Sequence, residues 1–449
     1  MRTFREAMDY LSRTTNYEQR GPSRYTPTVF KLDRMRSFAH ALGDPQEKLR
    51  AIHIAGTKGK GSVAYMAEAV LREAGFRTGL YLSPHVTGLT ERIQAGGRKI
   101  LRKDFARLVG LVRPAAERMA AANPELRPTF FEIMTAIAFL HFVERGADIA
   151  VLEVGLGGRL DATNIVNPLA GAITFIGMDH MRELGATIGR IAREKAGILK
   201  PGRSFVVAPQ TREAERAIEA VARKVGARLI RCGKEYRSLI RPDGKVDVFT
   251  PLRKHEGLSP AMAGIHQLEN AAVATALVDE LAPFGFSVNE EALRRGLASA
   301  RAPARFEILR KRPLVIIDGA HNQPSAKALA RELGRQGLSD GKLRLVAGLA
   351  RDKDADAFFA EFSHLKPFRV VLTRAQSPRA APVRALAAAA ERHFKRAVRG
   401  PGDVAATVAR ELARMRPSDA LCVTGSFYVA SEARAFLLGG KSSKSSIRA

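Results

Sequence analysis

Apolar residues in the first part of the chain follow two kinds of spacing, which predict strands and helices in turn. Five apolar runs have the length of strands that are buried on both faces of a parallel sheet. They lie at 51–55, 78–83, 148–156, 170–178 and 203–208. Between residues 63 and 74 the apolar positions recur every three or four residues, as on one face of a helix, and Gly75 supplies its stop. Strand, helix and strand in this order predict a βαβ unit.

The alternation continues to the C-terminus with one interruption. Further helical patterns occupy 129–143, 187–199 and about 267–283, and residues 228–257 have the pattern of short strands. A second alternation begins near Leu314, where strands are expected at 314–318, 343–349, 369–373 and 420–425. Pro303 and several small residues mark 298–307 as a linker between the two.

We therefore predict an α/β fold of two domains. Residues 1–300 would form an N-terminal domain with a mainly parallel sheet, and residues 301–440 a Rossmann-like C-terminal domain. Residues 441–449 (KSSKSSIRA) form a basic low-complexity tail that we expect to be disordered. The length of 449 residues agrees with two cores rather than one.

Composition narrows the class of protein. No apolar run reaches the length of a membrane span, and the N-terminus has no apolar segment typical of a signal peptide. The two cysteines, Cys232 and Cys422, lie in apolar runs, which suggests reduced thiols and a cytoplasmic location. The net charge of +28 is compatible with nucleic acid or with acidic small molecules. Because the charge is spread along the chain and there is no Trp for stacking, we favour acidic ligands and no nucleic acid.

The stretch IAGTKGKGS, 54–62, lies between the first strand and the first helix, where a phosphate-binding loop belongs. It departs from G-x-x-x-x-G-K-[ST] because Gly61 separates Lys60 from Ser62. Glycines let backbone N–H groups approach phosphate oxygens, Lys60 supplies a cation, and Ser62 can bind Mg²⁺ or cap the helix. The alternative is a flexible basic turn, which the strand and helix on either side make less favourable.

Other polar residues follow predicted strands, at the edge where ligands bind in open α/β folds. These are Ser83 and His85, Asp179 and His180, and Asp318 and His321, and each pair could equally belong to an ordinary turn.

Two acidic residues, one in an apolar run and one beside glycines, can each be interpreted as a ligand-binding residue or as part of the local structure. Glu132 lies in the apolar run TFFEIMTAIAF, where an acid needs a partner or a metal, although a carboxylate at a helix start is the plainer alternative. Asp161 in GLGGRLDATN could bind a ligand or hydrogen-bond within its turn, and Lys195 has the pattern of a solvated helix residue.

Taken together, these motifs resemble one enzyme family. GTKGKGS, SPH, FFE, EVGLGGRLDATN, REKAGI, HQLENAAVA, ARFE and DGAHN occur in that order, and SPRAAP and CVTGSFYVASEAR follow near the C-terminus. The chain is thereby similar to folylpolyglutamate synthase and its bifunctional relative dihydrofolate synthase, in the Mur ligase superfamily. The resemblance implies a P-loop-type Mur ligase central ATPase domain followed by a C-terminal glutamate-ligase domain.

The resemblance also implies expected roles for individual residues. ATP would contact Gly56, Thr57, Gly59, Lys60, Gly61, Ser62, Asn270, Arg305, Asp318 and His321. Mg²⁺ would be held by Ser62, Ser83, Glu132 and His180, and the pterin by Leu160, Asp161 and Ala162. Lys60, Lys195, His180 and His321 would be catalytic, and Lys195 matches a lysine that family members carry as a carbamate.

The implied reaction is a two-step ligation. A carboxylate of dihydropteroate or of a folate attacks the γ-phosphate of ATP, and L-glutamate then attacks the acyl phosphate. We expect a monomer that requires Mg²⁺. Two alternatives remain, namely a Mur-type ligase that acts on a cell-wall precursor and a nucleic-acid-binding P-loop ATPase.

Overall fold

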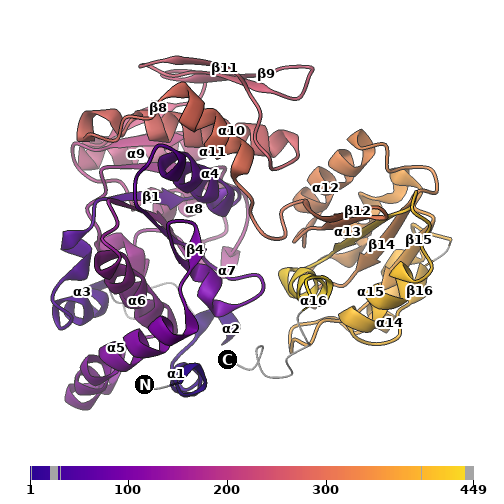
Figure 1. The fold of residues 1–449 in the computed structure, drawn as a ribbon, viewed down its shortest axis with the longest axis horizontal. Coiled ribbons are helices and arrows are strands. Elements are labelled where there is room, and N and C mark those ends of the chain that lie inside the picture. The colour runs from indigo at the N-terminus through magenta and orange to yellow at the C-terminus, as the bar shows by residue number, and fades with distance from the viewer. Residues whose placement is uncertain (2, 21–28, 31, 396, 440–449) are drawn as a thin grey trace.

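The computed structural model describes residues 1, 3–20, 29–30, 32–395 and 397–439, and within them the chain forms two α/β units that lie side by side (Figure 1). The first unit is built on an eight-stranded sheet of order β4-β3-β2-β5-β1-β6-β7-β8. All neighbours pair in parallel except β2–β3 and β3–β4. Its strands are β1 (Ala51–Ala55), β2 (Thr78–Tyr81), β3 (Ile93–Ala95), β4 (Arg98–Lys99), β5 (Ile149–Glu153), β6 (Ala170–Ile173), β7 (Ser204–Val207) and β8 (Arg228–Arg231).

Alternate residues of the central strand β1 point to opposite faces, and helices cover both. Ile52 and Ile54 pack in the same core as α4, α10 and α11, whereas Ala51 packs with α5 and α6. A third core lies between the sheet and α8 and α9. The helices are α1 (Phe4–Ser12), α2 (Tyr17–Arg20), α3 (Leu32–His40), α4 (Lys60–Glu73), α5 (Arg102–Ala122), α6 (Phe130–Glu144), α7 (Met181–Leu184), α8 (Ile188–Ala196), α9 (Arg212–Val225), α10 (Ile265–Asp279) and α11 (Glu290–Ser299).

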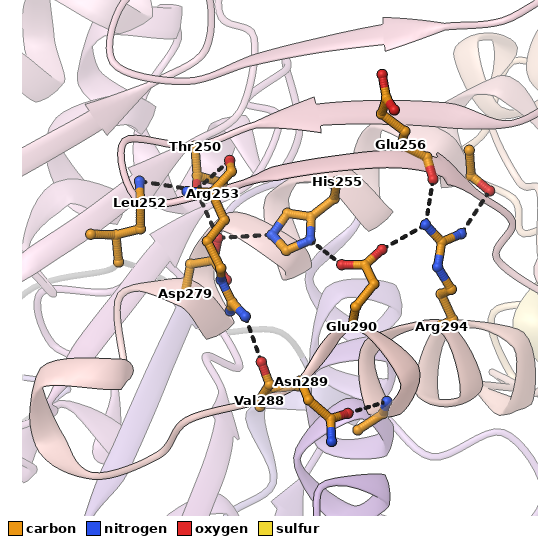
Figure 2. A network of polar contacts seen from close by, with 12 residues as sticks. Thr250, Leu252, Arg253, His255, Glu256, Asp279, Val288, Asn289, Glu290 and Arg294 are labelled. Atoms are coloured by element: carbon orange, nitrogen blue, oxygen red, sulfur yellow. Dashed lines mark hydrogen bonds and ion pairs between the residues drawn. The ribbon is translucent and has the colours of Figure 1, made fainter.

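A small antiparallel sheet of order β11-β10-β9 lies at one end of this unit. Its strands are β9 (Arg237–Ile240), β10 (Val246–Phe249) and β11 (Lys254–Leu258). His255 attaches it to the helices, since its ring contacts Glu290 Oε2 through Nδ1 (2.7 Å) and Asp279 Oδ2 through Nε2 (3.0 Å), as Figure 2 shows. Arg253 reaches Val288 O in the same network. Burial favours the neutral ring, but the two carboxylates outweigh it and raise the pKa of His255.

The second unit has a six-stranded sheet of order β12-β13-β17-β14-β15-β16, parallel except for β12. The strands are β12 (Glu307–Lys311), β13 (Leu314–Ile317), β14 (Leu343–Ala347), β15 (Arg369–Leu372), β16 (Ala397–Arg399) and β17 (Ala420–Thr424). The helices are α12 (Gln323–Arg335), α13 (Ala355–Ala360), α14 (Val383–Ala390), α15 (Val404–Leu412) and α16 (Phe427–Leu437).

Residues 300–306 join α11 to β12, inside the range expected for the linker. Ala304 and Phe306 have φ of +54° and +47°, a left-handed conformation that is unfavourable for residues with a Cβ. Hydrogen bonds hold both in place, since Ala304 N donates to Glu307 Oε2 (2.9 Å) and Phe306 N to Asp318 Oδ2 (2.8 Å).

The predicted α/β class with a mainly parallel first sheet is confirmed. Several boundaries differ by three residues or more. The strands expected at 170–178 and 148–156 end at Ile173 and Glu153, the helix expected from Val63 begins at Lys60, and the helices expected at 187–199 and about 267–283 end at Ala196 and Asp279. The edge strands β3, β4, β12 and β16 and the early helices were not predicted. No helix within the described ranges is both long and apolar enough to cross a bilayer. The predicted tail at 441–449 lies outside the described residues.

Candidate active site

The glycine-rich loop connects β1 to α4, as expected for a phosphate site. Gly56 and Gly59 have φ of +149° and +95°. A Cβ on Gly56 would lie 1.9 Å from Thr174 Oγ1, and a Cβ on Gly59 would lie 2.4 Å from Asn270 Oδ1. Both positions therefore require glycine. Asn270 of α10, expected to contact ATP, is thereby placed directly against the loop.

Hydrogen bonds to residues 175–177, which follow β6, fix the conformation of the glycine-rich loop. The N–H groups of Thr57 and Lys58 both donate to Phe175 O, at 2.9 and 3.1 Å, and Thr57 Oγ1 donates to Gly177 O. Gly59 is the N-cap of α4 and provides no side-chain cap. The first N–H groups of α4, from Lys60, Gly61 and Ser62, thus face the mouth of the loop, where an anion is favoured.

Cations and one carboxylate surround this loop. Lys195 is 5% exposed and its Nζ donates to Gly56 O at 2.9 Å, so it is not the solvated residue that its helical position suggests. Burial, aided by the charge of Lys60, lowers the pKa of Lys195 to about 7. Lys58 pairs with Asp179 at 3.2 Å. Burial alone would raise the pKa of Asp179, but Lys58 brings it to about 2.

His180 follows Asp179 in a left-handed conformation with φ of +51°. Burial lowers its pKa, and the charges of Lys60 and Lys195 act in the same direction while Asp179 opposes them. The burial is partial, since 57% of the His180 side chain is exposed, and the ring lies within electrostatic reach of Lys60 and Lys195.

Ser83 and Glu153 meet at the carboxyl ends of neighbouring strands β2 and β5. Ser83 N donates to Glu153 Oε2 at 3.0 Å, and the Ser83 hydroxyl is buried without a hydrogen-bond partner among the described residues. Both Glu153 oxygens lie 3.6 Å from the position of a Cβ on Gly61. Burial raises the pKa of Glu153, although Lys60 opposes the shift. Glu153 was absent from the expected ligands and is the carboxylate that the fold brings to the loop.

The carboxylate of Glu132, expected to bind Mg²⁺, is hydrogen-bonded within the fold. Arg34 Nε donates to both Glu132 oxygens, at 3.0 and 2.9 Å. Thr129 N and Thr129 Oγ1 donate to Glu132 Oε2, which makes a capping box at the start of α6. Glu132 thus stabilises a helix start and a contact with α3, and these bonds compete with the metal-binding role expected for it, which stays a prediction.

The glycine-rich turn after β5 is held by Asp161. Its Oδ2 accepts from Gly155 N (3.0 Å) and Leu156 N (2.9 Å), and its Oδ1 accepts from Thr163 N (3.0 Å) and Thr163 Oγ1 (2.5 Å). His53 of β1 contacts the same hydroxyl at 2.8 Å. Each Asp161 oxygen thus accepts two hydrogen bonds within the turn. The carboxylate has little hydrogen-bonding capacity left for a direct contact with a pterin.

This turn also links two parts of the site. A Cβ on Gly158 would lie 2.8 Å from both Glu194 O and Lys195 O, so the turn packs closely on the end of α8. The turn starts two residues after Glu153. Ala162 packs in the core that contains α5 and α6, and Leu160 packs against the core that contains α8 and α9. Residues 153–162 therefore run from Glu153, at the end of β5, to a turn that packs against α8, the helix that carries Lys195.

The second unit contributes Arg305, Asp318 and His321 to the other wall. Arg305 lies over the Phe427 ring at 4.8 Å and lines a cavity with Gly61, Ser83, His85 and Glu153. Asp318 accepts from Phe306 N and Ala320 N at 2.8 Å each, so its carboxylate fixes the linker instead of pointing freely at a nucleotide. Arg434 of α16 donates to Glu307 and to Thr87 of the first unit, and it thereby bridges the two.

His321 is close to Lys58 and Asp179. Its Nδ1 lies 2.9 Å from Gly319 O, and since a carbonyl can only accept, Nδ1 carries a proton. Burial, aided by Lys58, lowers the pKa of His321 to about 4. In the neutral ring Nε2 is therefore an acceptor. Nε2 can donate a hydrogen bond to a phosphate only after it is protonated.

The residues described contain no group of three or more His, Cys, Asp or Glu side chains arranged for a metal ion. A metal at this site would thus need the hydroxyl oxygens and the oxygens of a bound nucleotide as well, which is the usual pattern for Mg²⁺. The arrangement offers backbone donors and lysines to phosphate oxygens beside a buried carboxylate, and residues of both units line the adjoining cavity.

Comparison with known proteins gives two family matches. Residues 54–278 match the Mur ligase middle domain, and residues 304–427 match the Mur ligase glutamate ligase domain. The chain is 34% identical over 409 residues to the dihydrofolate synthase/folylpolyglutamate synthase of Bacillus subtilis, covering 90% of this chain and 94% of that protein.

Two further similarities extend this result. A Haloferax volcanii protein named for folylpolyglutamate synthase and dihydropteroate synthase is 35% identical over 410 residues, which cover 90% of this chain and 48% of that protein. The chain thus spans about half of that longer relative. The solved structure of Mycobacterium tuberculosis folylpolyglutamate synthase complexed with ADP superposes with a TM-score of 0.85 at 31% identity, covering 97% of this chain and 98% of that one.

Proposed function

The chain belongs to the Mur ligase family, and from this premise we propose that it uses ATP to join L-glutamate to the carboxylate of a folate and of 7,8-dihydropteroate. The relatives named above are ligases of this kind, which favours this reading over a cell-wall precursor ligase or a nucleic-acid-binding ATPase. The observation that carries the proposal is one electrostatic cluster built from both units. In it, Lys58 pairs with Asp179, Lys195 donates to Gly56 O, and Glu153 lies beside Gly61. Arg305 and Phe427 line the same cavity as Gly61 and Glu153 from the other side.

The residues present fit a magnesium ion. The Ser83 hydroxyl is buried without a partner among the described residues and lies beside the Glu153 carboxylate, and hydroxyl and carboxylate oxygens are ligands that Mg²⁺ prefers. We propose that Ser62, Ser83 and Glu153 hold the ion, with His180 at the rim. When bound, the ion would neutralise charge on the nucleotide phosphates.

The phosphate loop orients ATP for attack by the acceptor carboxylate. Backbone N–H groups of the first turn of α4 bind phosphate oxygens, and Lys60 stabilises the negative charge on the transferred γ-phosphoryl group and on the departing ADP. The resulting acyl phosphate must be kept from water until the amine of L-glutamate displaces phosphate. Arg305 and Phe427 form the wall that closes the cavity on the side of the second unit.

For His321 we propose a part other than the expected one. Because Nδ1 donates to Gly319 O, its Nε2 lone pair can accept a proton or a hydrogen bond. We propose that Nε2 accepts a hydrogen bond from the amino group of L-glutamate and orients it, rather than neutralising phosphate. The amine attacks in its neutral form, after its ammonium proton has been lost to solvent. The low pKa of about 4 keeps the ring neutral at physiological pH, as this role requires.

The turn at 155–164 would form the base of the pterin pocket. Leu160 and Ala162 offer apolar contacts beside it, and Asp161 supports the turn from below through its four hydrogen bonds. The carbamate expected on Lys195 is supported by an amine whose pKa is lowered to about 7, since only a neutral amine reacts with carbon dioxide.

The test is ADP release by purified protein given ATP, Mg²⁺ and L-glutamate with either dihydropteroate or tetrahydrofolate. We expect glutamate-dependent turnover with both acceptors, and mass spectrometry of the products should show added glutamyl residues. No turnover with either pterin would overturn the proposal. Turnover with tetrahydrofolate alone would restrict it to chain extension.

Two variants connect this activity to the loop. Lys60→Ala should lose ligation by more than about 100-fold while its thermal unfolding stays unchanged, because the side chain faces phosphate rather than core. Lys103→Ala, an exposed lysine on α5, is the matched control and should keep wild-type turnover. Gel filtration of the same preparation checks the expectation of a monomer.

A further inference from the structure

His85 lies in the chain segment after β2, and its side chain lines the cavity between the two units. The same cavity is lined by Gly61 of the phosphate loop, by Ser83 and Glu153, and by Arg305 from the linker. His85 is thus part of the wall that faces the reacting groups. It is one of the polar residues that follow predicted strands, but neither the roles implied by the resemblance nor the metal and phosphate contacts proposed above include it.

The orientation of the His85 ring is set by a buried arginine. Arg92 is 1% exposed, and its Nε donates to His85 Nδ1 at 3.0 Å. Its other nitrogens donate to both oxygens of Glu18 in α2. The Arg92 guanidinium also lies over the Phe130 ring at 5.4 Å. A buried guanidinium is costly unless it is fully paired, so this arrangement leaves Arg92 little freedom to move.

This contact determines which ring nitrogen of His85 carries the proton. Arginine has donors and no acceptor, so Nδ1 of His85 must accept and cannot carry a proton. The ring proton is therefore on Nε2. The structure gives Nε2 no hydrogen-bond partner among the described residues, and the ring borders the cavity. Glu18, Arg92 and His85 together present one fixed N–H donor to the space beside Ser83 and Glu153.

We propose that His85 Nε2–H donates a hydrogen bond to an anionic oxygen of a reactant, either a phosphoryl oxygen of ATP or a carboxylate oxygen of an acid substrate. This inference rests on the proposed function. A neutral donor can bind an anionic oxygen without adding a further cation to a cavity that Arg305 already lines. Glu18 and Arg92 are positioning residues in this arrangement, since they act through His85.

Two substitutions separate a donor from a purely structural histidine. Asn at position 85 can still accept from Arg92 but has no group at the place of Nε2–H, whereas Gln can place an N–H there. If His85 is a donor, His85→Asn should lower kcat/KM by about 10- to 100-fold, the effect of one hydrogen bond to a charged group, and His85→Gln should recover most of it. If His85 only supports Arg92, His85→Asn keeps wild-type kinetics, which overturns the proposal.

The kinetic constants identify the oxygen that is bound. A raised KM for ATP indicates a phosphoryl oxygen, and a raised KM for the pterin or for L-glutamate indicates the carboxylate of that substrate. A fall in kcat alone indicates a bond made only in the transition state. Each of these outcomes supports the donor role, and unchanged constants for all three substrates refute it.

Chemical rescue covers the case in which His85→Asn does not fold. His85→Ala should regain activity with added imidazole and none with 1-methylimidazole, which can accept from Arg92 but has no N–H to donate. Equal rescue by both, or by neither, overturns the donor role.

An inactive wild-type protein would refute the proposed function and leave this inference open to direct measurement. Calorimetric binding of the nonhydrolysable ATP analogue AMPPCP and of tetrahydrofolate is then compared between wild type and His85→Asn. Weaker binding of one ligand supports the donor, and equal binding of both refutes it.

Discussion

Thr163 is the centre of a buried chain of hydrogen bonds, and its hydroxyl makes a quantitative prediction possible. Thr163 is fully buried, accepts from His53 Nε2 at 2.8 Å and donates to Asp161 Oδ1 at 2.5 Å. Thr163→Val keeps the shape and removes both bonds. His53 Nδ1 already has no partner among the described residues, so the substitution leaves the whole ring unpaired in the core.

The magnitude follows from these two losses. An unpaired buried donor on His53 costs about 1–3 kcal/mol, and the lost bond to a carboxylate costs about 1.5–3 kcal/mol. Asp161 keeps three other donors, which limits its part. We expect the free energy of unfolding to fall by about 3–5 kcal/mol, a large part of the roughly 5–15 kcal/mol typical of a folded domain. Ligase activity should also fall, because Asp161 holds the turn between Glu153 and Lys195.

The chain contains a matched control. Thr275 of α10 is also fully buried, but its hydroxyl has no hydrogen-bond partner among the described residues. Thr275→Val makes the same chemical change without breaking a bond, so it should alter the free energy of unfolding by less than about 1 kcal/mol. Urea unfolding followed by far-UV circular dichroism measures both variants, since the chain has no Trp for fluorescence.

A double mutant tests whether the cost arises from the chain of hydrogen bonds itself. His53→Leu with Thr163→Val should cost less than the sum of the two single changes, by about 1 kcal/mol or more, because each single change leaves the other partner unsatisfied. The reasoning is refuted if Thr163→Val is as stable as Thr275→Val, or if the two single costs add.

Three further predictions follow from the site and from the small sheet. Glu153→Gln should reduce ligation by more than about 100-fold in a folded protein, whereas Glu132→Gln should lower the melting temperature through its pair with Arg34 and keep specific activity; the reverse result would restore Glu132 as the metal ligand. Gly59→Ala should raise the KM for ATP, because its Cβ would meet Asn270, and an unchanged KM would contradict the tight packing. The raised pKa of His255 means that its contribution to stability is complete below about pH 6.5 and is lost as pH rises through the raised value, so wild type but not His255→Gln should lose stability over that range in pH-dependent urea unfolding.

Periodicity was sufficient for the central parallel strands of both sheets and for the residues at their carboxyl ends, because those features depend on local pattern. Glu153 could have been found from sequence, since it is an acid that ends an apolar strand directly before glycines. The spacing of Thr129 and Glu132 is itself the pattern of a capping box, so the engagement of Glu132 was also accessible. The expected roles of the other site residues stay predictions, and the geometry supports them in different degrees.

Other features depend on contacts between distant parts of the chain, which no local pattern contains. Arg92 and Glu18 are 74 residues apart in sequence, and Lys195 reaches Gly56 across 139 residues. Neither the tautomer of His85 nor the burial of Lys195 could be derived before the helices were placed on the sheet. The orientation of His321 likewise depends on a backbone carbonyl, Gly319 O, that only the folded loop places within reach.

The bonds that hold the linker have a mechanical consequence. Asp318 and Glu307 fix Phe306 and Ala304, so the last three linker residues move as a rigid extension of the second unit. Any rotation between the units must then be taken up by the backbone at 300–303. Arg305 lies close to this pivot. A rotation of the second unit about it would move Arg305 and His321 together toward the phosphate loop. Domain closure and assembly of the nucleotide wall would then be a single movement.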